Sequence, residues 1–103
     1  MSTKKSKAVK ELEKIIGGSV AFGEFLYSLR STEEMTQADL AEEAGTTKAK
    51  ICDFEKGRRT PTLELAARLA RALGHSEALF VKKILEEQIK EADLKLKIKI
   101  EAA

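Results

Sequence analysis

The sequence predicts an all-α fold: a compact five-helix domain preceded by a short extra helix and followed by one strand-like segment. Apolar residues recur at helical spacing as far as about residue 92. Serines and threonines precede these stretches and glycines follow them, as expected where helices begin and end. With 103 residues, 43% of them hydrophobic, the chain suits a single domain with modest extensions.

Capping residues divide the helical pattern into separate stretches. A serine or threonine hydroxyl can accept the unpaired N–H groups of a first helical turn, and a glycine can take the left-handed conformation that ends a helix. The expected helices are residues 7–16, ended by Gly17 and Gly18; residues 20–33, capped by Ser19; residues 37–44, preceded by Thr36 and ended by Gly45; residues 47–56, capped by Thr46 and ended by Gly57; residues 63–73, capped by Thr62 and ended by Gly74; and a last helix opened by Ser76.

Residues 94–101 break the helical pattern. Their sequence, LKLKIKIE, alternates apolar and charged residues, which indicates a half-buried strand. A lone strand leaves unpaired backbone groups on both edges, so it needs a partner, and a second copy of the chain is the simplest. The alternative is that the preceding helix continues to residue 101. We expect the dimer contact at Leu85, Ile89, Leu94, Leu96, Ile98 and Ile100.

Composition excludes several classes of protein. One cysteine allows no internal disulfide, and with the single His75 it makes no metal-ligand cluster, so we expect neither metal nor cofactor. No apolar run approaches a membrane span, and the lysine-rich start lacks the apolar core of a signal peptide. No acid–base pair, phosphate-binding glycine loop or Cys–His set indicates an enzyme. We therefore expect a cytoplasmic protein that is not an enzyme.

Charge is segregated along the chain although the net charge is only +2. Residues 4–14 hold five lysines and two glutamates, and residues 33–43 hold five acids and no bases. Residues 48–59 again hold five bases, against Asp53 and Glu55. Such segregation is expected where different faces of a protein meet different partners.

Residues 36–57, TQADLAEEAGTTKAKICDFEKG, predict a helix-turn-helix. Two helices joined by a short turn pack at a steep angle only where their closest surfaces are small, and Ala41 allows that approach. Gly45 can take the positive φ that the turn requires. A purely structural helical hairpin is the alternative to the usual use of this motif, which is DNA binding. The residues expected to fill the wedge between the helices are Leu40, Ala44, Ile51 and Phe54.

The same residues carry a resemblance to a known family. MTQADLA at residues 35–41, GTT at 45–47, ICDFEKG at 51–57 and RTPT at 59–62 resemble the Xre/Cro-type helix-turn-helix family, which includes the lambdoid phage repressors. The resemblance covers residues 22–74 and implies a five-helix domain whose third helix, here residues 47–56, reads the major groove. We accordingly divide the chain into a basic arm and short helix (1–18), a helix-turn-helix DNA-binding domain (19–75), and a C-terminal helix and strand (76–103).

The N-terminal part of residues 47–56 is expected to enter the groove. Lys48 could donate to guanine, Ala49 could meet a thymine methyl group, and Asp53 could accept from cytosine N4. Asp53 could instead be a solvated residue or a partner of Lys56 or Lys50. Cys52, at the edge of this face, is either a redox switch or simply a small side chain near DNA. The expected base contacts are Thr47, Lys48, Ala49, Cys52 and Asp53.

A second set of residues is expected to hold phosphates, which fix register rather than read sequence. Thr36 and Gln37 begin a helix whose free N–H groups favour an anion, and the family resemblance implies this role for Gln37. Arg58 and Arg59 lie in the loop that leaves the recognition helix. The expected phosphate contacts are Thr36, Gln37, Lys50, Lys56, Arg58 and Arg59, while Glu42 and Glu43 should face away from DNA.

Glu55 is expected in a structural ion pair. It follows Ile51 by four residues, so it leans toward the core, where a carboxylate needs a partner. Arg30 lies at the corresponding edge of its own helix, and the family resemblance also implies such a pair. We therefore predict that Arg30 and Glu55 join the recognition helix to the preceding helices.

These expectations describe a repressor-like regulator that binds double-stranded DNA as a homodimer. Two recognition helices would reach successive major grooves, about 34–36 Å apart, on a near-palindromic operator. One alternative is an antitoxin that pairs residues 94–101, or docks residues 1–16, on a toxin protein and represses its own operon. Another is a helical adaptor that does not bind DNA.

Overall fold

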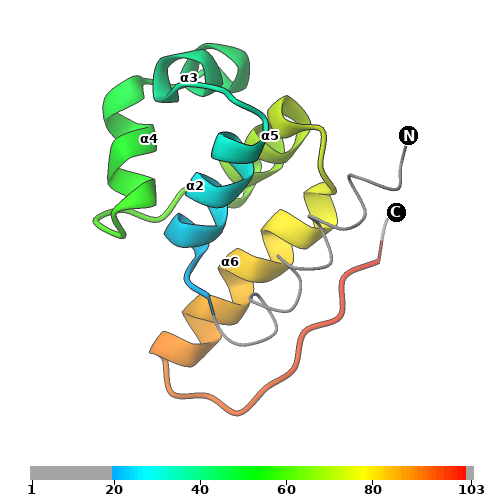
Figure 1. Cartoon of the computed structure of the whole chain (residues 1–103). Coiled ribbons are helices and arrows are strands. Elements are labelled where there is room, and N and C mark those ends of the chain that lie inside the picture. Colours follow the sequence, from blue (N-terminus) through cyan, green and yellow to red (C-terminus); the bar gives the residue numbers. More distant parts are fainter. Residues whose placement is uncertain (1–19, 102–103) are drawn as a thin grey trace.

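The computed structural model describes residues 20–101, and this part of the chain contains five helices and no strand. The all-α prediction is confirmed for it, whereas the short helix predicted over residues 7–16 lies outside it. Figure 1 shows the short helices on one side and the long last helix on the other. The helices are α2 (Phe22–Thr32), α3 (Gln37–Ala44), α4 (Lys48–Glu55), α5 (Leu63–Leu73) and α6 (Glu77–Glu91).

Most helices begin at the residues that the sequence indicates. Thr36, Thr62 and Ser76 are N-caps whose hydroxyls accept backbone N–H groups of α3, α5 and α6. The predicted cap of α4 is wrong by one residue: Thr47, not Thr46, is the N-cap and accepts from the Lys50 N–H. The Thr46 N–H donates to the Ala41 carbonyl at 2.8 Å, so Thr46 still belongs to the end of α3.

Helix α2 has an unusual cap that comes from the other end of the domain. Its N-cap is Ala21, not the predicted Ser19, and an alanine side chain can accept no hydrogen bond. The Phe22 N–H donates instead to the carboxylate of Glu87 on α6. Burial raises the pKa of the Glu87 carboxyl above its ordinary value, although the hydrogen bond from Phe22 and the nearby charge of Lys83 oppose this shift.

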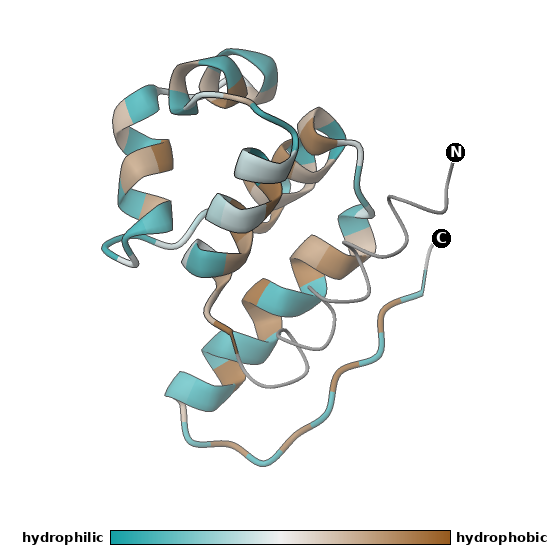
Figure 2. Ribbon diagram, in the orientation of Figure 1, coloured by the Kyte–Doolittle hydropathy of each residue, from teal (hydrophilic) through white to brown (hydrophobic). Residues whose placement is uncertain are grey.

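The core lies between the inward faces of all five helices. Phe22 and Phe25 of α2 pack edge-on against Phe80 of α6, with ring centroids 5.9 and 5.1 Å apart. Figure 2 shows hydrophobic residues recurring along α5 and α6. The largest fully buried side chains are Phe25, Phe80, Leu26, Leu29, Leu40, Ile51, Leu69 and Ile84.

Helices α2 and α4 touch at Gly23. A Cβ atom at this position would lie 2.4 Å from the Phe54 carbonyl oxygen and 2.6 Å from that of Glu55. Glycine is therefore required by the distance between two backbones, not by a turn. This contact fixes α4 against the side of α2.

Residues 94–101 form no strand in the single chain, and the helix does not continue through them either. Helix α6 ends at Glu91, and Asp93 has a left-handed φ of 59° that ends the helical path. The segment then follows an irregular path along the lower side of the molecule (Figure 1). Leu94 and Leu96 remain 53% and 62% exposed, because a strand without a partner has no ladder to hold it.

Candidate nucleic-acid interface

The corner between α3 and α4 is built as the sequence predicts. Gly45 adopts the left-handed conformation, with φ 74° and ψ 39°, and its N–H donates to the Glu42 carbonyl in the last turn of α3. Ala41 and Ala44 are buried at the corner, where their small side chains allow α4 to cross closely. Ile51 and Phe54 bury the inner face of α4 against this support. The other face of α4 is therefore left toward solvent.

That outer face begins with the N-terminal turn of α4. Thr47, Lys48, Ala49 and Lys50 are all exposed, and α4 lies at the left flank of the molecule in Figure 1. The Thr47 hydroxyl already accepts the Lys50 N–H at 3.2 Å, as an N-cap does, but its own proton is free to donate. The first turn of α4 is thus an exposed edge that carries two lysines and no acid.

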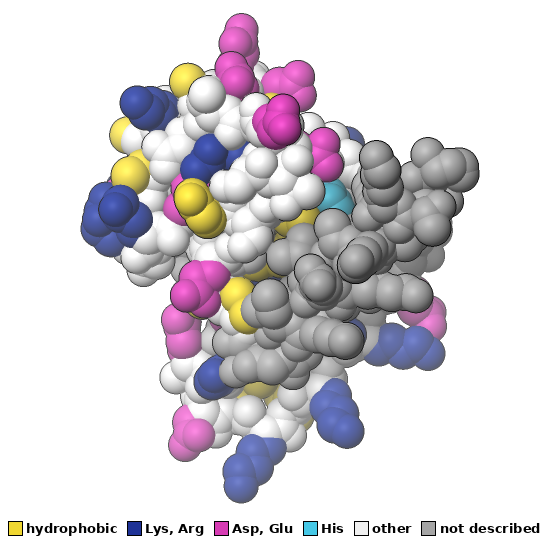
Figure 3. All heavy atoms as spheres, viewed as in Figure 1, with side chains coloured by type: hydrophobic (Ala, Val, Ile, Leu, Met, Phe, Trp, Pro, Cys, Tyr) yellow, Lys and Arg dark blue, Asp and Glu magenta, His cyan; other side chains and the backbone are white. Residues whose placement is uncertain are grey.

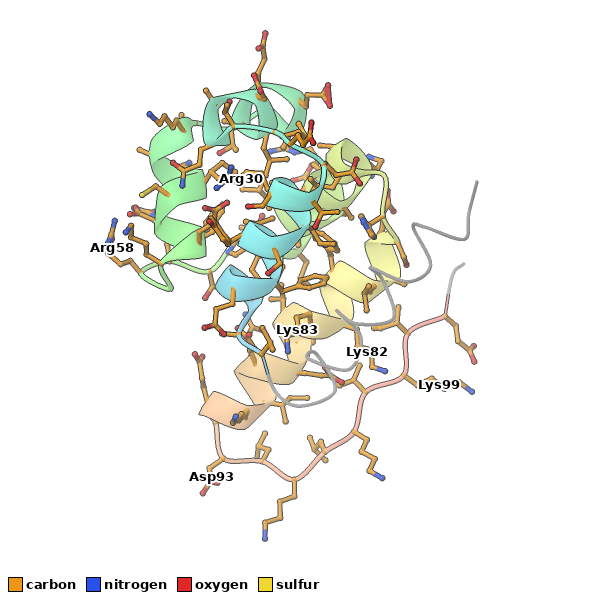
Figure 4. All side chains as sticks on the ribbon, in the orientation of Figure 1. Arg30, Arg58, Lys82, Lys83, Asp93 and Lys99 are labelled. Atoms are coloured by element: carbon orange, nitrogen blue, oxygen red, sulfur yellow. The ribbon has the colours of Figure 1, made fainter. Side chains whose placement is uncertain are left out.

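Behind this edge, Glu55 holds three elements together. Its carboxylate accepts from Arg30 of α2, through Nε at 2.6 Å and a terminal nitrogen at 3.1 Å, and from the Gln37 amide of α3 at 2.9 Å. Arg30 also donates to the Met35 carbonyl at 2.7 Å. The predicted ion pair is therefore present, with side chains only 12% and 5% exposed, and Figure 4 shows Arg30 between α2 and α4. The hydrogen bond to Glu55 raises the pKa of Arg30 further above its ordinary value.

The start of α3 differs from the expected phosphate site. The Thr36 hydroxyl accepts from the Asp39 N–H at 3.0 Å, and the Asp39 carboxylate accepts from the Thr36 N–H at 3.1 Å. This capping box already occupies groups of Thr36 that an anion would need, and it adds a negative charge there. Gln37 likewise has one partner within the protein. Both residues thus have structural roles whether or not they meet DNA.

Asp53 is engaged by arginines from the loop after α4. Its two carboxylate oxygens lie 3.1 Å from Arg58 Nε and 3.5 Å from Arg59 Nε. The Arg58 guanidinium also lies 3.8 Å from Cys52 Sγ. The alternative partners expected for Asp53 were Lys50 and Lys56, so the sequence indicated a salt bridge but with the wrong bases. The chain reverses at Gly57, which has a φ of 75°, and this turn brings the arginines back to Asp53.

Charges are unevenly spread over the surface. In Figure 3, basic side chains gather on the flank where α4 and its following loop lie, and acidic side chains gather over α3. Among the residues that the structure describes, no group of three potential metal ligands occurs, and no helix is long and apolar enough to span a membrane. The exposed bases of the basic flank are Lys48, Lys50, Lys56, Arg58 and Arg59.

The chain belongs to a helix-turn-helix domain family. The family's sequence pattern matches residues 21–80, which are more than half of this chain. A protein of Methanothermobacter thermautotrophicus, named an uncharacterized HTH-type transcriptional regulator, is 51% identical over 49 residues; these are 46% of this chain and 71% of that protein. No solved structure matches the chain. The family and this relative support a DNA-binding regulator.

Two features of the site were missed in the sequence, although both leave a signal there. Thr36 and Asp39 have the spacing of a capping box, Ser or Thr followed three residues later by an acid. Gly23 interrupts an otherwise apolar helical stripe, which usually has a packing reason. The capping box begins α3, and Gly23 sets how closely α2 and α4 pack.

Proposed function

We propose that the chain is a sequence-specific DNA-binding regulator of transcription that acts as a repressor. The observation that carries the proposal is the exposed first turn of α4, which holds Lys48, Ala49 and Lys50 outward, while the loop after the other end of the helix exposes Arg58 and Arg59. A helix presented in this way, at its N-terminal end, has the docking geometry of a helix-turn-helix in the major groove.

In this proposal the two kinds of contact are divided between neighbouring elements. Lys48 and Ala49, with Thr47 and Cys52, face base edges, where lysine suits guanine and alanine suits a thymine methyl group. Lys50, Lys56 and the two loop arginines hold phosphates on either side of the groove. Of the remaining expected contacts, Gln37 keeps a free amide oxygen and N–H beyond its bond to Glu55.

The functional test is selection of bound duplexes from a random pool at two salt concentrations. A near-palindromic consensus is expected, since two copies related by a two-fold axis would read the same half-site twice. Failure to enrich any sequence, together with the absence of salt-dependent binding to DNA, would instead indicate the helical adaptor.

One substitution tests the phosphate contacts directly. Arg59→Ala should reduce the slope of log affinity against log salt by about one, with little change in the selected consensus. Lys90→Ala is the matched control, because Lys90 is an exposed base in the last turn of α6. An equal loss of slope in both variants would mean that the protein responds only to net charge.

The proposed homodimer would use the C-terminal segment. Leu94 and Leu96 are exposed, and Ile98 and Ile100 are half-buried, as are Leu85 and Ile89 of α6. Pairing residues 94–101 with the same residues of a second copy would satisfy their backbone groups and cover the exposed leucines.

A second candidate function rests on the same exposed leucines. An antitoxin would add residues 94–101 to a sheet of a toxin protein and would repress the operon that encodes both. A short reading frame that adjoins or overlaps this one, and whose product tightens operator binding, would favour this candidate over the homodimer alone.

A further inference from the structure

We propose that Asp53 is a positioning residue for the two loop arginines and does not itself read a base. The inference rests on the proposed DNA-binding function and deepens it. Asp53 stands on the outer side of α4, 28% exposed, where a carboxylate alone would repel phosphates. Its two oxygens are instead shared between Arg58 and Arg59, one oxygen to each guanidinium.

The arginine atoms used in these two contacts determine which N–H groups of Arg58 and Arg59 remain for a ligand. Both arginines approach Asp53 through Nε, so their terminal NH₂ groups are not needed for the carboxylate, and of these groups one nitrogen of Arg58 contacts Cys52 Sγ at 3.8 Å. Those groups form the fork that binds phosphate oxygens. The side chains of Arg58 and Arg59 are 58% and 57% exposed, and Figure 4 shows Arg58 at the outer edge of the molecule beyond α4. Asp53 can therefore hold both residues without covering the surface that meets DNA.

Backbone contacts support the same arrangement. The Arg58 N–H donates to the Asp53 carbonyl at 2.9 Å, so the loop is fixed to the end of α4 at the residue that binds its side chain. An isolated exposed ion pair contributes little because ordering two long side chains costs entropy. Here one short, partly shielded carboxylate orders two arginines at once, and a network of this kind is where such pairs become significant. The entropy cost of holding the arginines is met before DNA arrives.

The same geometry removes Asp53 from base readout. To accept from cytosine N4, a carboxylate needs a free lone pair directed at the base edge. Each oxygen of Asp53 already faces an arginine of its own chain, so the arginines compete with a base for the carboxylate and offset its charge. Asp53 should thus affect how tightly any duplex is held, and not which duplex is preferred.

Asp53→Asn tests the proposal because asparagine keeps the shape of the side chain and removes its charge. Affinity is measured for the selected consensus duplex and for a mixed-sequence duplex of the same length, in the wild-type protein and in the Arg58→Ala/Arg59→Ala double variant. We expect Asp53→Asn to weaken binding to both duplexes alike, by roughly two- to tenfold. In the double variant it should have no such effect, since its two partners are gone. Asp53→Glu, which keeps the charge, should restore part of the affinity.

Several results would overturn the proposal or the function on which it rests. A loss confined to the consensus, and persisting without the arginines, would assign base reading to Asp53. Tighter binding by Asp53→Asn would show that the carboxylate only repels DNA. A wild-type protein that binds neither duplex would refute the proposed function itself. The ion pairs can be judged separately and without DNA: the Nε–H resonances of Arg58 and Arg59 should shift in Asp53→Asn, and unchanged resonances would show that the pairs do not form in solution.

Discussion

Gly23 is the residue at which two helix backbones come closest, and its substitution should be costly. Gly23→Ala improves helix propensity by about 1 kcal/mol, but the added Cβ meets the Phe54 and Glu55 carbonyl oxygens. Backbone atoms cannot move aside as a flexible side chain can, so we expect the clash to win. The free energy of unfolding, measured in urea, should fall by about 1–3 kcal/mol.

The control for Gly23→Ala is a substitution to alanine on the exposed side of the same helix. Ser31 lies in α2 and is exposed, so Ser31→Ala should change the free energy of unfolding by less than about 0.5 kcal/mol. If Gly23→Ala stabilised the protein, the close approach of α2 and α4 would not exist in solution.

A second prediction at the scale of single residues concerns the Glu55 carboxylate. Glu55→Ala leaves the Arg30 guanidinium nearly buried without its partner and removes the acceptor of the Gln37 amide. Breaking one side of such a pair costs about 3–5 kcal/mol of unfolding free energy, which thermal or urea denaturation would detect.

Replacing both charged members of that pair separates the ion pair from simple packing. Arg30→Met/Glu55→Leu leaves no uncompensated charge, so the double variant should recover most of the stability that Glu55→Ala loses. A double variant as unstable as Glu55→Ala would show that the pair acts through shape and not through charge.

At the scale of elements, α2 depends on Glu87 of α6 for its cap, and the burial of that carboxyl should make stability depend on pH. The pKa of Glu87 is raised in the folded protein, so the folded state holds this proton more tightly than the unfolded chain does. Its contribution is therefore fully present below the ordinary glutamate pKa of about 4.3 and is lost as pH rises through the raised value. The wild-type protein should gain stability relative to Glu87→Gln as pH falls from 7 to 4.

Urea unfolding of both proteins at the two pH values measures this difference. The two proteins differ at this residue alone, so subtracting one free energy from the other gives the contribution of Glu87. A difference that stays constant, or that changes in the opposite direction, would contradict the burial of this carboxyl against the first turn of α2.

The helices could largely be predicted from the sequence because the residues that begin and end them are adjacent to them in the chain. Thr62 and Ser76 lie next to the helices they cap, and Gly45 and Gly74 take the left-handed conformation that their positions suggest. The cap of α2 was not readable, because Glu87 is 65 residues from Phe22 and only the packing of α6 brings it there. Residues next to a helix therefore predict where it ends, whereas a cap supplied by a distant residue leaves no signal in the neighbouring sequence.

The outer face of α4 shows the same division between local and distant information. The exposed turn of α4 follows from the helical spacing of Ile51 and Phe54, which fixes the face that is buried. The partners of Asp53 do not follow from helical spacing, because Arg58 and Arg59 lie beyond the helix and return only through the turn at Gly57. Spacing within a helix could suggest only Lys50 or Lys56.

At the scale of the whole molecule, the C-terminal segment provides the test of assembly. Leu94→Lys/Leu96→Lys places charges on the two most exposed apolar side chains of residues 94–101. If this segment joins two copies, sedimentation should show a shift from dimer to monomer, and affinity for a palindromic duplex should fall more than affinity for a half-site. Lys95→Ala/Lys97→Ala changes the intervening charged positions and should leave the dimer intact.

Two outcomes would contradict that arrangement. A wild-type chain that sediments as a monomer at all concentrations would leave residues 94–101 to another partner or to none. A leucine variant that remains dimeric would place the contact elsewhere. The strand reading failed in the single chain for a physical reason, since period-two alternation describes how a segment could pair but supplies no partner.

The Glu87 cap also bears on the order of events during synthesis. A ribosome releases the residues of α2 first and those of α6 much later, and until then the leading Phe22 amide can bond only to water. The aromatic rings of Phe22 and Phe25 also cannot complete their packing until α6 has been synthesised, because α6 supplies Phe80. A nascent chain from which all of α4 has emerged has therefore not yet completed the core that supports α4, so premature release of the polypeptide yields fragments without a finished core.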